Sequence, residues 1–217
     1  MKVIITGATG MVGEGVMLEC LEDPRVKEVL IVNRKHYEYE HPKLKELLVP
    51  DFMHLEKFSE QLKGYDACFY CAGISSVGVK EEQYTRVTFD TTITFARQLL
   101  QLNPGMVFTF VSGNRTDSSE KGKVMWARVK GKTENALMAL PFKDAYNFRP
   151  AIMKGTKGQK NVKTIYKILG PLIAPFFPQK TLTLKQVGQA MINAVTKGYP
   201  KQILEVDDID QLSKSGN

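Results

Sequence analysis

Residues 3–13 read Val3-Ile-Ile-Thr-Gly-Ala-Thr-Gly-Met-Val-Gly13, and this stretch decides the fold of the 217-residue chain. An apolar, β-branched run enters three glycines, and Met11–Leu21 continues with apolar residues at helical spacing. A strand, a glycine turn and a helix in this order begin a βαβ unit. We expect Gly7 to permit a tight turn, Gly10 to let backbone approach a ligand, and Gly13 to let helix and strand pack closely.

Strands and helices alternate along the rest of the chain. We expect further strands at Val29–Val32, Leu47–Val49, Ala67–Cys71, Met106–Val111, Ala145–Phe148 and Ile203–Val206. We expect further helices at Glu81–Leu102, Val124–Leu140 and Leu184–Lys197, the first of them stopped by Asn103-Pro104-Gly105. Strands that alternate with helices of this length predict an α/β fold, a doubly wound parallel sheet with helices on both faces.

Composition excludes several classes of protein. The chain is 43% hydrophobic and 24% charged, as ordinary globular proteins are. Its longest apolar runs, such as Val107–Val111, are far shorter than a membrane span. Three cysteines do not make a disulfide framework, and the first strand begins at Lys2, which leaves no room for a signal peptide. We therefore expect a soluble, cytoplasmic protein.

The glycine turn indicates a dinucleotide. A helix that starts at the turn offers free amides and the positive end of its dipole to a pyrophosphate. An acid at the end of the second strand would select NAD by binding the ribose 2′-hydroxyl. This chain has Asn33-Arg34-Lys35 at that position, and an Arg fork suits a phosphate monoester. The residues favour NADP(H), with NAD(H) as the alternative, since basic pairs after strands also occur by chance.

Positive charge gathers in the second half of the chain. The net charge is +7, and residues 121–167 hold 12 Lys and Arg against only Glu134 and Asp144. A block this one-sided either binds an anionic ligand or is a solvated surface. No nucleic-acid-binding motif accompanies it, so we expect a small, anionic substrate and no nucleic-acid partner. His36, His41 and His54 lack metal-ligand spacing, so we expect no metal.

Two features beyond Pro150 have two interpretations each. Five lysines repeat at helical spacing and form either a solvated face or the rim of an anion site: Lys154, Lys157, Lys160, Lys163 and Lys167. The apolar stretch Ile168–Pro178 is either a lid or a homodimer contact, since its prolines and glycine make it a poor membrane helix. We place a dinucleotide-binding core at residues 1–150 and a small substrate-side cap, packed on that core, at residues 151–217.

The motifs resemble the short-chain dehydrogenase/reductase superfamily, in its extended or atypical NAD(P)-dependent epimerase/dehydratase-like branch. The spacing of Thr-Gly-Ala-Thr-Gly is typical of that branch, and the small size is similar to that of Tat-interacting-protein-like members. The resemblance implies cofactor contacts near the adenine, beside the fourth strand and against the nicotinamide. The cofactor residues it implies are Thr6, Gly7, Thr9, Gly10, Met11, Val12, Gly13, Asn33, Arg34, Lys35, Asp51, Phe52, Cys71, Ala72, Gly73, Thr88, Lys130, Arg149 and Pro150.

The catalytic pattern departs from the family at one position. The family pairs Tyr with Lys in Tyr-x-x-x-Lys, and this chain has Trp126-Ala-Arg-Val-Lys130. An indole has no titratable oxygen and cannot exchange a hydroxyl proton near neutral pH. The resemblance implies that Ser112 binds a substrate carbonyl and Lys130 the nicotinamide ribose. Reduction then uses another donor, the reaction needs no such tyrosine, or the protein binds NADP(H) without turnover.

These observations lead to two hypotheses. The first is an NADP(H)-dependent oxidoreductase-like or nucleoside-diphosphate-sugar epimerase-like protein whose catalytic set is Ser112, Lys130 and Trp126 in place of Tyr. The second is a non-catalytic NADP(H)-binding regulator or scaffold.

Overall fold

The computed structural model describes residues 1–156, 158–161 and 181–215. Within them, seven strands form one sheet in the order β3-β2-β1-β4-β5-β6-β9, and every neighbouring pair is parallel. The strands are β1 (Lys2–Thr6), β2 (Glu28–Asn33), β3 (Leu44–Leu48), β4 (Ala67–Tyr70), β5 (Val107–Val111), β6 (Asp144–Phe148) and β9 (Ile203–Leu204). The α/β doubly wound prediction is confirmed. Because strand order reverses between β1 and β4, ligands are expected at the carboxyl ends of these strands.

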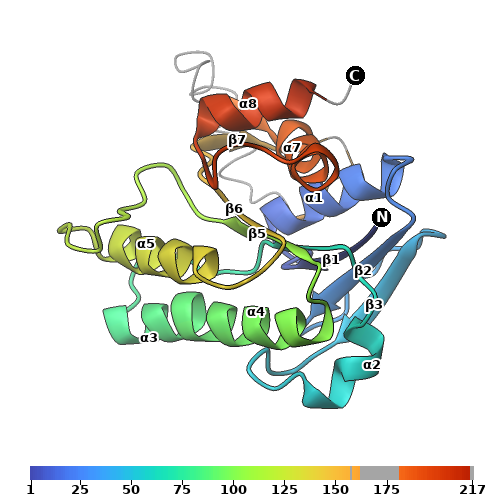
Figure 1. The fold of residues 1–217 in the computed structure, drawn as a ribbon, viewed down its shortest axis with the longest axis horizontal. Helices are drawn as coiled ribbons and strands as arrows, with labels where there is room; N and C mark the ends of the chain where they lie inside the picture. Colours follow the sequence, from blue (N-terminus) through green and yellow to red (C-terminus); the bar gives the residue numbers. More distant parts are fainter. Residues whose placement is uncertain (157, 162–180, 216–217) are drawn as a thin grey trace.

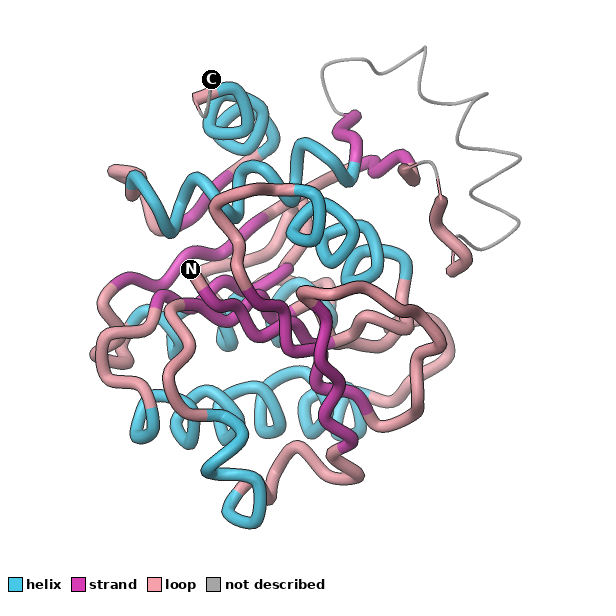
Figure 2. Tube along the Cα trace, turned by 90° about the vertical axis from the view of Figure 1, so that its right-hand side faces the viewer, coloured by secondary structure: helices cyan, strands magenta, loops and turns pink. Residues whose placement is uncertain are grey.

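Helices cover both faces of the sheet (Figures 1 and 2). One face carries α1 (Met11–Glu22) and α7 (Leu184–Lys197), with α8 (Val206–Lys214) packed on α7. The other carries α3 (Glu81–Thr85), the π-helical segment η2 (Arg86–Asp90), α4 (Thr91–Leu102) and α5 (Met125–Met138). The short turns η1 (Glu56–Phe58) and α2 (Ser59–Leu62) link β3 to β4. The short strands β7 (Ile152–Lys154) and β8 (Thr181–Thr183) pair with each other, outside the main sheet.

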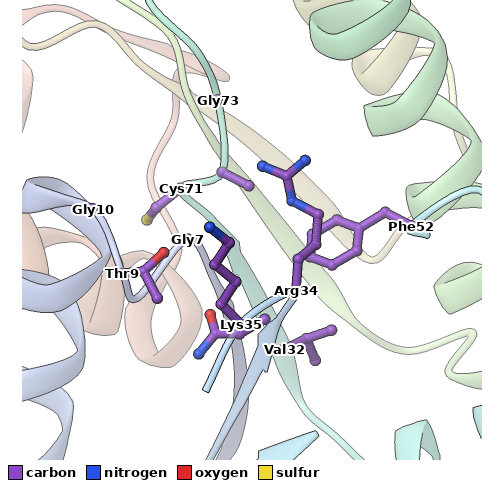
Figure 3. A pocket seen from close by; sticks show the side chains of 11 residues that line it. Gly7, Thr9, Gly10, Val32, Arg34, Lys35, Phe52, Cys71 and Gly73 are labelled. Carbon is purple, nitrogen blue, oxygen red and sulfur yellow. The ribbon is translucent and has the colours of Figure 1, made fainter. Parts of the chain in front are cut away.

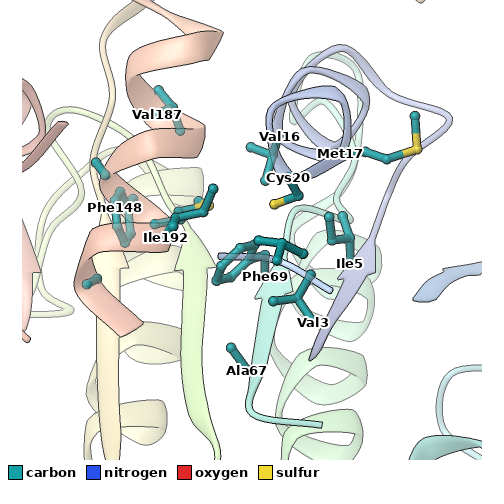
Figure 4. Packing of buried hydrophobic residues seen from close by; sticks show 14 of the residues in the cluster. Val3, Ile5, Val16, Met17, Cys20, Ala67, Phe69, Phe148, Val187 and Ile192 are labelled. Carbon is teal, nitrogen blue, oxygen red and sulfur yellow. The ribbon is translucent and has the colours of Figure 1, made fainter. Parts of the chain in front are cut away.

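Two apolar clusters hold these layers together, one on each face of the sheet. Figure 4 shows the cluster beneath α1 and α7, where Val16 and Ile192 lie over Phe69 and Phe148. The opposite cluster joins β4 and β5 to α4 and includes Phe95, which is fully buried. Alternate strand residues enter opposite clusters, which explains why the strands read as continuous apolar runs.

Two strands, β3 and β9, differ from the expected bounds by more than one residue. The third strand covers Leu44–Leu48, three residues earlier than the expected start at Leu47. β3 lies at the edge of the sheet, and its residues are half-buried or exposed. Because neither face of the strand is fully buried, its sequence shows only a weak alternation of apolar and charged residues. The last strand stops at Leu204 because Val206 begins α8, a helix that the sequence analysis did not predict. The buried apolar residues of α8, Val206, Ile209 and Leu212, recur at intervals of three within a short acidic segment, so the helical pattern is weak in the sequence.

The C-terminal part completes the main sheet and its helical cover. Strand β9 pairs with β6, and α7 packs directly on α1. Two glycines allow the helices to approach: a Cβ on Gly15 would lie 2.7 Å from Leu184 Cβ, and one on Gly188 would lie 2.7 Å from Glu19 Cβ. Residues after 150 therefore belong partly to the core, besides any role as a cap.

Candidate functional site

A pocket of about 560 Å³ opens at the carboxyl ends of β1, β2 and β4 (Figure 3). The glycine turn and the loop after β4 lie side by side along one wall, and the end of β2 and Phe52 lie opposite them. The described residues that line it are Gly7, Thr9, Gly10, Val32, Asn33, Arg34, Lys35, Phe52, Cys71, Ala72 and Gly73. All of these except Val32 are among the cofactor residues expected from the sequence. Val32 was missed because it reads as one more apolar strand residue.

The glycine turn has the geometry that a phosphate-binding loop needs. Gly7 has φ of 73°, and a Cβ there would lie 2.8 Å from the Ala72 nitrogen. A Cβ on Gly13 would lie 2.2 Å from the Gly7 oxygen, so α1 can start against the turn only with glycine there. Thr6 is buried, and its Oγ1 accepts from the backbone nitrogens of Cys71 and Ala72 at 3.1 Å. Thr6 therefore fastens the two strand ends that flank the pocket.

The N-terminus of α1 is open to an anion. Gly10 is the N-cap residue, and no side chain accepts a hydrogen bond there. The first turn, which includes Met11, Val12 and Gly13, keeps backbone donors and the positive end of the helix dipole. This arrangement suits a phosphate or pyrophosphate.

The end of β2 contributes two cations. Arg34 and Lys35 are exposed, and their side chains rise into the pocket beside Phe52 and the glycine turn (Figure 3). Among the described residues neither forms an ion pair. The preceding Asn33 is buried, and its Nδ2 donates to Glu46 Oε1 at 3.2 Å. An anionic group could therefore approach both cations without first breaking an ion pair.

The segment after β3 divides between the pocket and solvent. Phe52 is buried and lines the pocket. Asp51 is exposed, and its carboxylate accepts from the Met53 nitrogen at 2.9 Å, with His54 at 3.8 Å. Asp51 thus closes a turn that presents Phe52, while its expected contact with the adenine stays a prediction.

The expected catalytic residues lie around the end of β5, outside the lining of this pocket. Ser112 is buried, and its Oγ lies 2.8 Å from Thr116 Oγ1. Lys130 Nζ donates to the Ser112 oxygen at 2.9 Å and to the Val111 oxygen at 3.3 Å. Burial lowers the pKa of Lys130 to about 8, although the nearby Glu134 opposes this shift.

Trp126 covers the same strand end. A Cβ on Gly113 would lie 3.7 Å from the Trp126 ring, so the half-buried indole packs against the residue that follows Ser112. Thr88 is buried in η2, a π-helical segment whose neighbours include α5. Such segments often accompany functional sites. The structure thus gathers Ser112, Trp126 and Lys130 at one strand end, but their roles in catalysis stay predictions.

Arg149 has a structural role that the sequence did not indicate. Its guanidinium bonds Glu134 at 2.5 and 3.0 Å, Glu205 at 3.0 Å and Ser118 at 2.6 Å. Glu134 is fully buried, so this ion pair ties α5 to β6 and to the start of α8. Burial is the largest single effect and lowers the pKa of Arg149, but the hydrogen bonds that Arg149 donates to Glu134 and Glu205, with the charges of both carboxylates, together raise it. Contacts of Arg149 and Pro150 with a nicotinamide stay predictions.

Only part of the lysine-rich stretch after Pro150 lies among the described residues. Lys154 is exposed, and Lys160 Nζ donates to the Glu38 oxygen at 3.1 Å. Lys157, Lys163, Lys167 and the stretch Ile168–Pro178 lie outside the described residues. Within the described part of the chain, no helix has the length and apolarity to cross a bilayer. The same residues contain no group of three or more His, Cys, Asp or Glu side chains placed to hold a metal ion.

The family follows from a comparison with known proteins. The model of the NAD dependent epimerase/dehydratase family matches residues 3–123, more than half of the chain. The chain belongs to this family. The match covers the glycine turn, the basic pair after β2 and Ser112. It ends before Trp126 and Lys130, so it does not cover the helix that carries these two expected catalytic residues.

Relatives of this epimerase/dehydratase chain include Protein HTATIP2 of Rattus norvegicus, 25% identical over 154 residues. The alignment covers 70% of this chain and 62% of the rat protein, so the chain spans less than two thirds of that relative. This confirms the resemblance to Tat-interacting-protein-like members.

Solved structures share the fold at low identity. MoeE5, in complex with UDP-glucuronic acid and NAD, superposes with a TM-score of 0.71 at 17% identity, covering 95% of this chain and 76% of its own. An ADP-L-glycero-D-manno-heptose-6-epimerase of Helicobacter pylori gives 0.71 at 13% identity, covering 99% and 81%. A short chain dehydrogenase family protein of Francisella tularensis gives 0.68 at 12%, covering 95% and 98%.

Proposed function

We propose that the chain binds NADP(H) in the pocket at the glycine turn and is an oxidoreductase-like or nucleoside-diphosphate-sugar epimerase-like protein. Membership of the epimerase/dehydratase family supports a nicotinamide dinucleotide, and MoeE5 is described with NAD. One observation carries the preference for NADP(H): Arg34 and Lys35 enter the pocket with no ion pair among the described residues, and Asn33 replaces the acid that selects NAD.

The residues present fit such a cofactor. The uncapped N-terminus of α1 offers donors to a pyrophosphate. Gly73 lines the pocket with nothing within 4 Å of its Cβ position, so this wall leaves room for a bound group. Phe52 supplies an apolar surface for an adenine, and Arg34 supplies planar donors for a 2′-phosphate. When bound, the nicotinamide would supply or accept a hydride.

A substrate of the proposed enzyme would meet the end of β5. Ser112 Oγ would donate to a substrate carbonyl, and Lys130 would hold the ribose of the nicotinamide. Trp126 supplies no titratable proton, so a proton would have to come from water or another group. We propose a small, anionic substrate because of the basic block at residues 121–167.

A specific observation supports a second function, NADP(H) binding without turnover by a regulator or scaffold. The Lys130 ammonium already donates to two backbone carbonyls, and the Trp126 ring packs where the family's proton donor stands. Both functions share the same pocket, and an activity assay separates them.

Replacing Arg34 tests the choice of cofactor. Calorimetry on wild-type protein is expected to show tighter binding of NADPH than of NADH. Arg34→Ala is expected to lower NADPH affinity about ten- to a hundredfold, the value of a hydrogen bond to a charged group, and to leave NADH affinity unchanged. Arg97→Ala, an exposed change on α4, is the control. Equal affinities in wild type, or an unchanged ratio in Arg34→Ala, would refute the NADP(H) preference.

A further inference from the structure

The basic segment after β2 is held by a carboxylate from the neighbouring edge strand. Glu46 of β3 accepts from Asn33 Nδ2 at 3.2 Å and from the Tyr37 backbone nitrogen at 2.9 Å, both on Oε1. Its Oε2 pairs with His36 Nδ1. Asn33 precedes Arg34 and Lys35, and Tyr37 follows them after one residue. A single carboxylate therefore anchors both ends of the segment that carries the two cations.

A second carboxylate fixes the exit of the same segment. Glu14 lies in the first turn of α1 and is fully buried. Its Oε1 accepts from the Tyr37 hydroxyl at 2.7 Å. The same carboxylate also accepts from the backbone nitrogens of Lys160 at 2.8 Å and Asn161 at 2.7 Å. Tyr37 is thus bonded through its backbone to β3 and through its side chain to α1.

This arrangement leaves the cations free while it restricts their backbone. Both carboxylates are used on backbone and neutral donors and on His36, and neither forms an ion pair with Arg34 or Lys35 among the described residues. Ordering a long side chain on binding costs free energy, and a pre-ordered backbone reduces that cost. NADH lacks the 2′-phosphate, so it would gain little from ordered cations.

We infer that Glu46 is a positioning residue for selectivity between NADPH and NADH, and that the Tyr37–Glu14 hydrogen bond is a second anchor for the same segment. The inference rests on the proposed binding of NADP(H) at Arg34 and Lys35. Glu46 acts through the backbone of residues 33–37 and does not itself touch the phosphate. Its negative charge would weaken phosphate binding slightly, so its benefit lies in geometry.

Calorimetric titration of the full chain with NADPH and with NADH tests this role. Glu46→Ala is expected to lower NADPH affinity about tenfold, while NADH affinity changes less than about twofold. Glu46→Gln keeps an acceptor for Asn33 and Tyr37, so it is expected to restore most of the lost selectivity. Tyr37→Phe is expected to lower the selectivity for NADPH over NADH about threefold. Lys45→Ala is the matched control, since Lys45 lies next to Glu46 on β3 but bonds Glu28.

Each outcome is decisive. An equal fall for both cofactors in Glu46→Ala would show a purely structural role, and a rise in NADPH affinity would show that the carboxylate repels the phosphate; either result overturns the inference. If Glu46→Ala does not fold, an unchanged ratio in Tyr37→Phe overturns it. A wild-type protein without NADPH preference overturns both this inference and the proposed cofactor. A preference that Arg34→Ala abolishes but Glu46→Ala preserves overturns the inference alone.

Discussion

One side chain, Trp126, separates the two proposed functions. It stands one helical turn before Lys130, the spacing on which the expected Tyr-x-x-x-Lys match is based. Ser112 and Lys130 lie at the same strand end, and Lys130 bonds the backbone oxygen of Ser112. The two residues that we propose for catalysis therefore lie near an aromatic residue that has no acidic proton near neutral pH.

Trp126→Tyr is expected to raise NADPH-dependent carbonyl reduction on the order of a hundredfold, because a positioned general acid contributes a factor of this size. Trp126→Phe is the matched control, since it alters the ring without adding a hydroxyl. NADPH oxidation over a panel of carbonyls and quinones is the measurement. Brisk wild-type carbonyl turnover that Trp126→Tyr does not improve would show that another donor operates. No turnover in any of the three proteins would favour the binding-only function.

At the scale of elements, α5 reaches the site through a close contact with the loop before it. A Cβ on Gly131 would lie 1.8 Å from the Asp117 backbone oxygen. The Asp117 carboxylate accepts from the Ser119 hydroxyl at 2.6 Å and from the Gly122 nitrogen at 2.6 Å, which holds the loop in shape. These bonds, led by the one from Ser119, lower the pKa of Asp117. The helix therefore packs on a fixed turn at Gly131, and the neighbouring Lys130 reaches the end of β5.

Gly131→Ala separates helix propensity from packing. Propensity alone predicts that Ala stabilises a helix by about 1 kcal/mol relative to Gly. The contact with Asp117 predicts a net loss of about 1–3 kcal/mol in the free energy of unfolding, as in other overpacked sites. Urea denaturation measures the difference. Gly105→Ala is the control, because nothing lies within 4 Å of its Cβ position. If Gly131→Ala stabilises the protein, the loop at Asp117 moves away from the added methyl group at little cost in free energy.

At the scale of the whole molecule, a polar network joins the N- and C-terminal parts. Arg25 donates to the Asp23 carboxylate at 2.7 and 2.9 Å and to Asn193 Oδ1 at 2.7 Å. Gln189 Nε2 also donates to Asp23, at 3.1 Å. The network links the end of α1 to α7, beside the contact that Gly15 and Gly188 allow. Hydrogen bonds led by that of Arg25 lower the pKa of Asp23 from 3.8 to about 2.

This shift predicts how stability depends on pH. The folded pKa of Asp23 lies below the unfolded value, so its contribution is present above about pH 4 and is lost as pH falls through 4 toward 2. A shift of this size corresponds to about 2 kcal/mol. Asp23→Asn is expected to lose about that much at pH 7 and to approach wild type near pH 2, by urea denaturation. The exposed Asp90→Asn is the control. If the stability lost in Asp23→Asn stays constant with pH, the loss comes from altered packing or hydrogen-bond geometry and not from the charge of Asp23.

Much of the fold could be predicted because its signals are local. The glycine turn, the apolar strands and the stop after Leu102 each lie within a few neighbouring residues, and the structure has them at or near the expected positions. The edge strand at Leu44–Leu48 and helix α8 were less predictable, because pairing with β2 and packing on α7, respectively, compensate for their weak local patterns.

The sequence by itself determined the α/β class and, with the family resemblance, the pocket lining except Val32, since parallel strands bring their carboxyl ends to one edge of the sheet. Only the tertiary structure decided which polar groups are free and which are occupied. Arg34 stays without an ion pair among the described residues, whereas Arg149 is bound by Glu134 and Glu205. Glu46, unremarkable in the sequence, holds Asn33 and Tyr37. These partners come from different elements, and no local periodicity encodes which side chains packing will bring together.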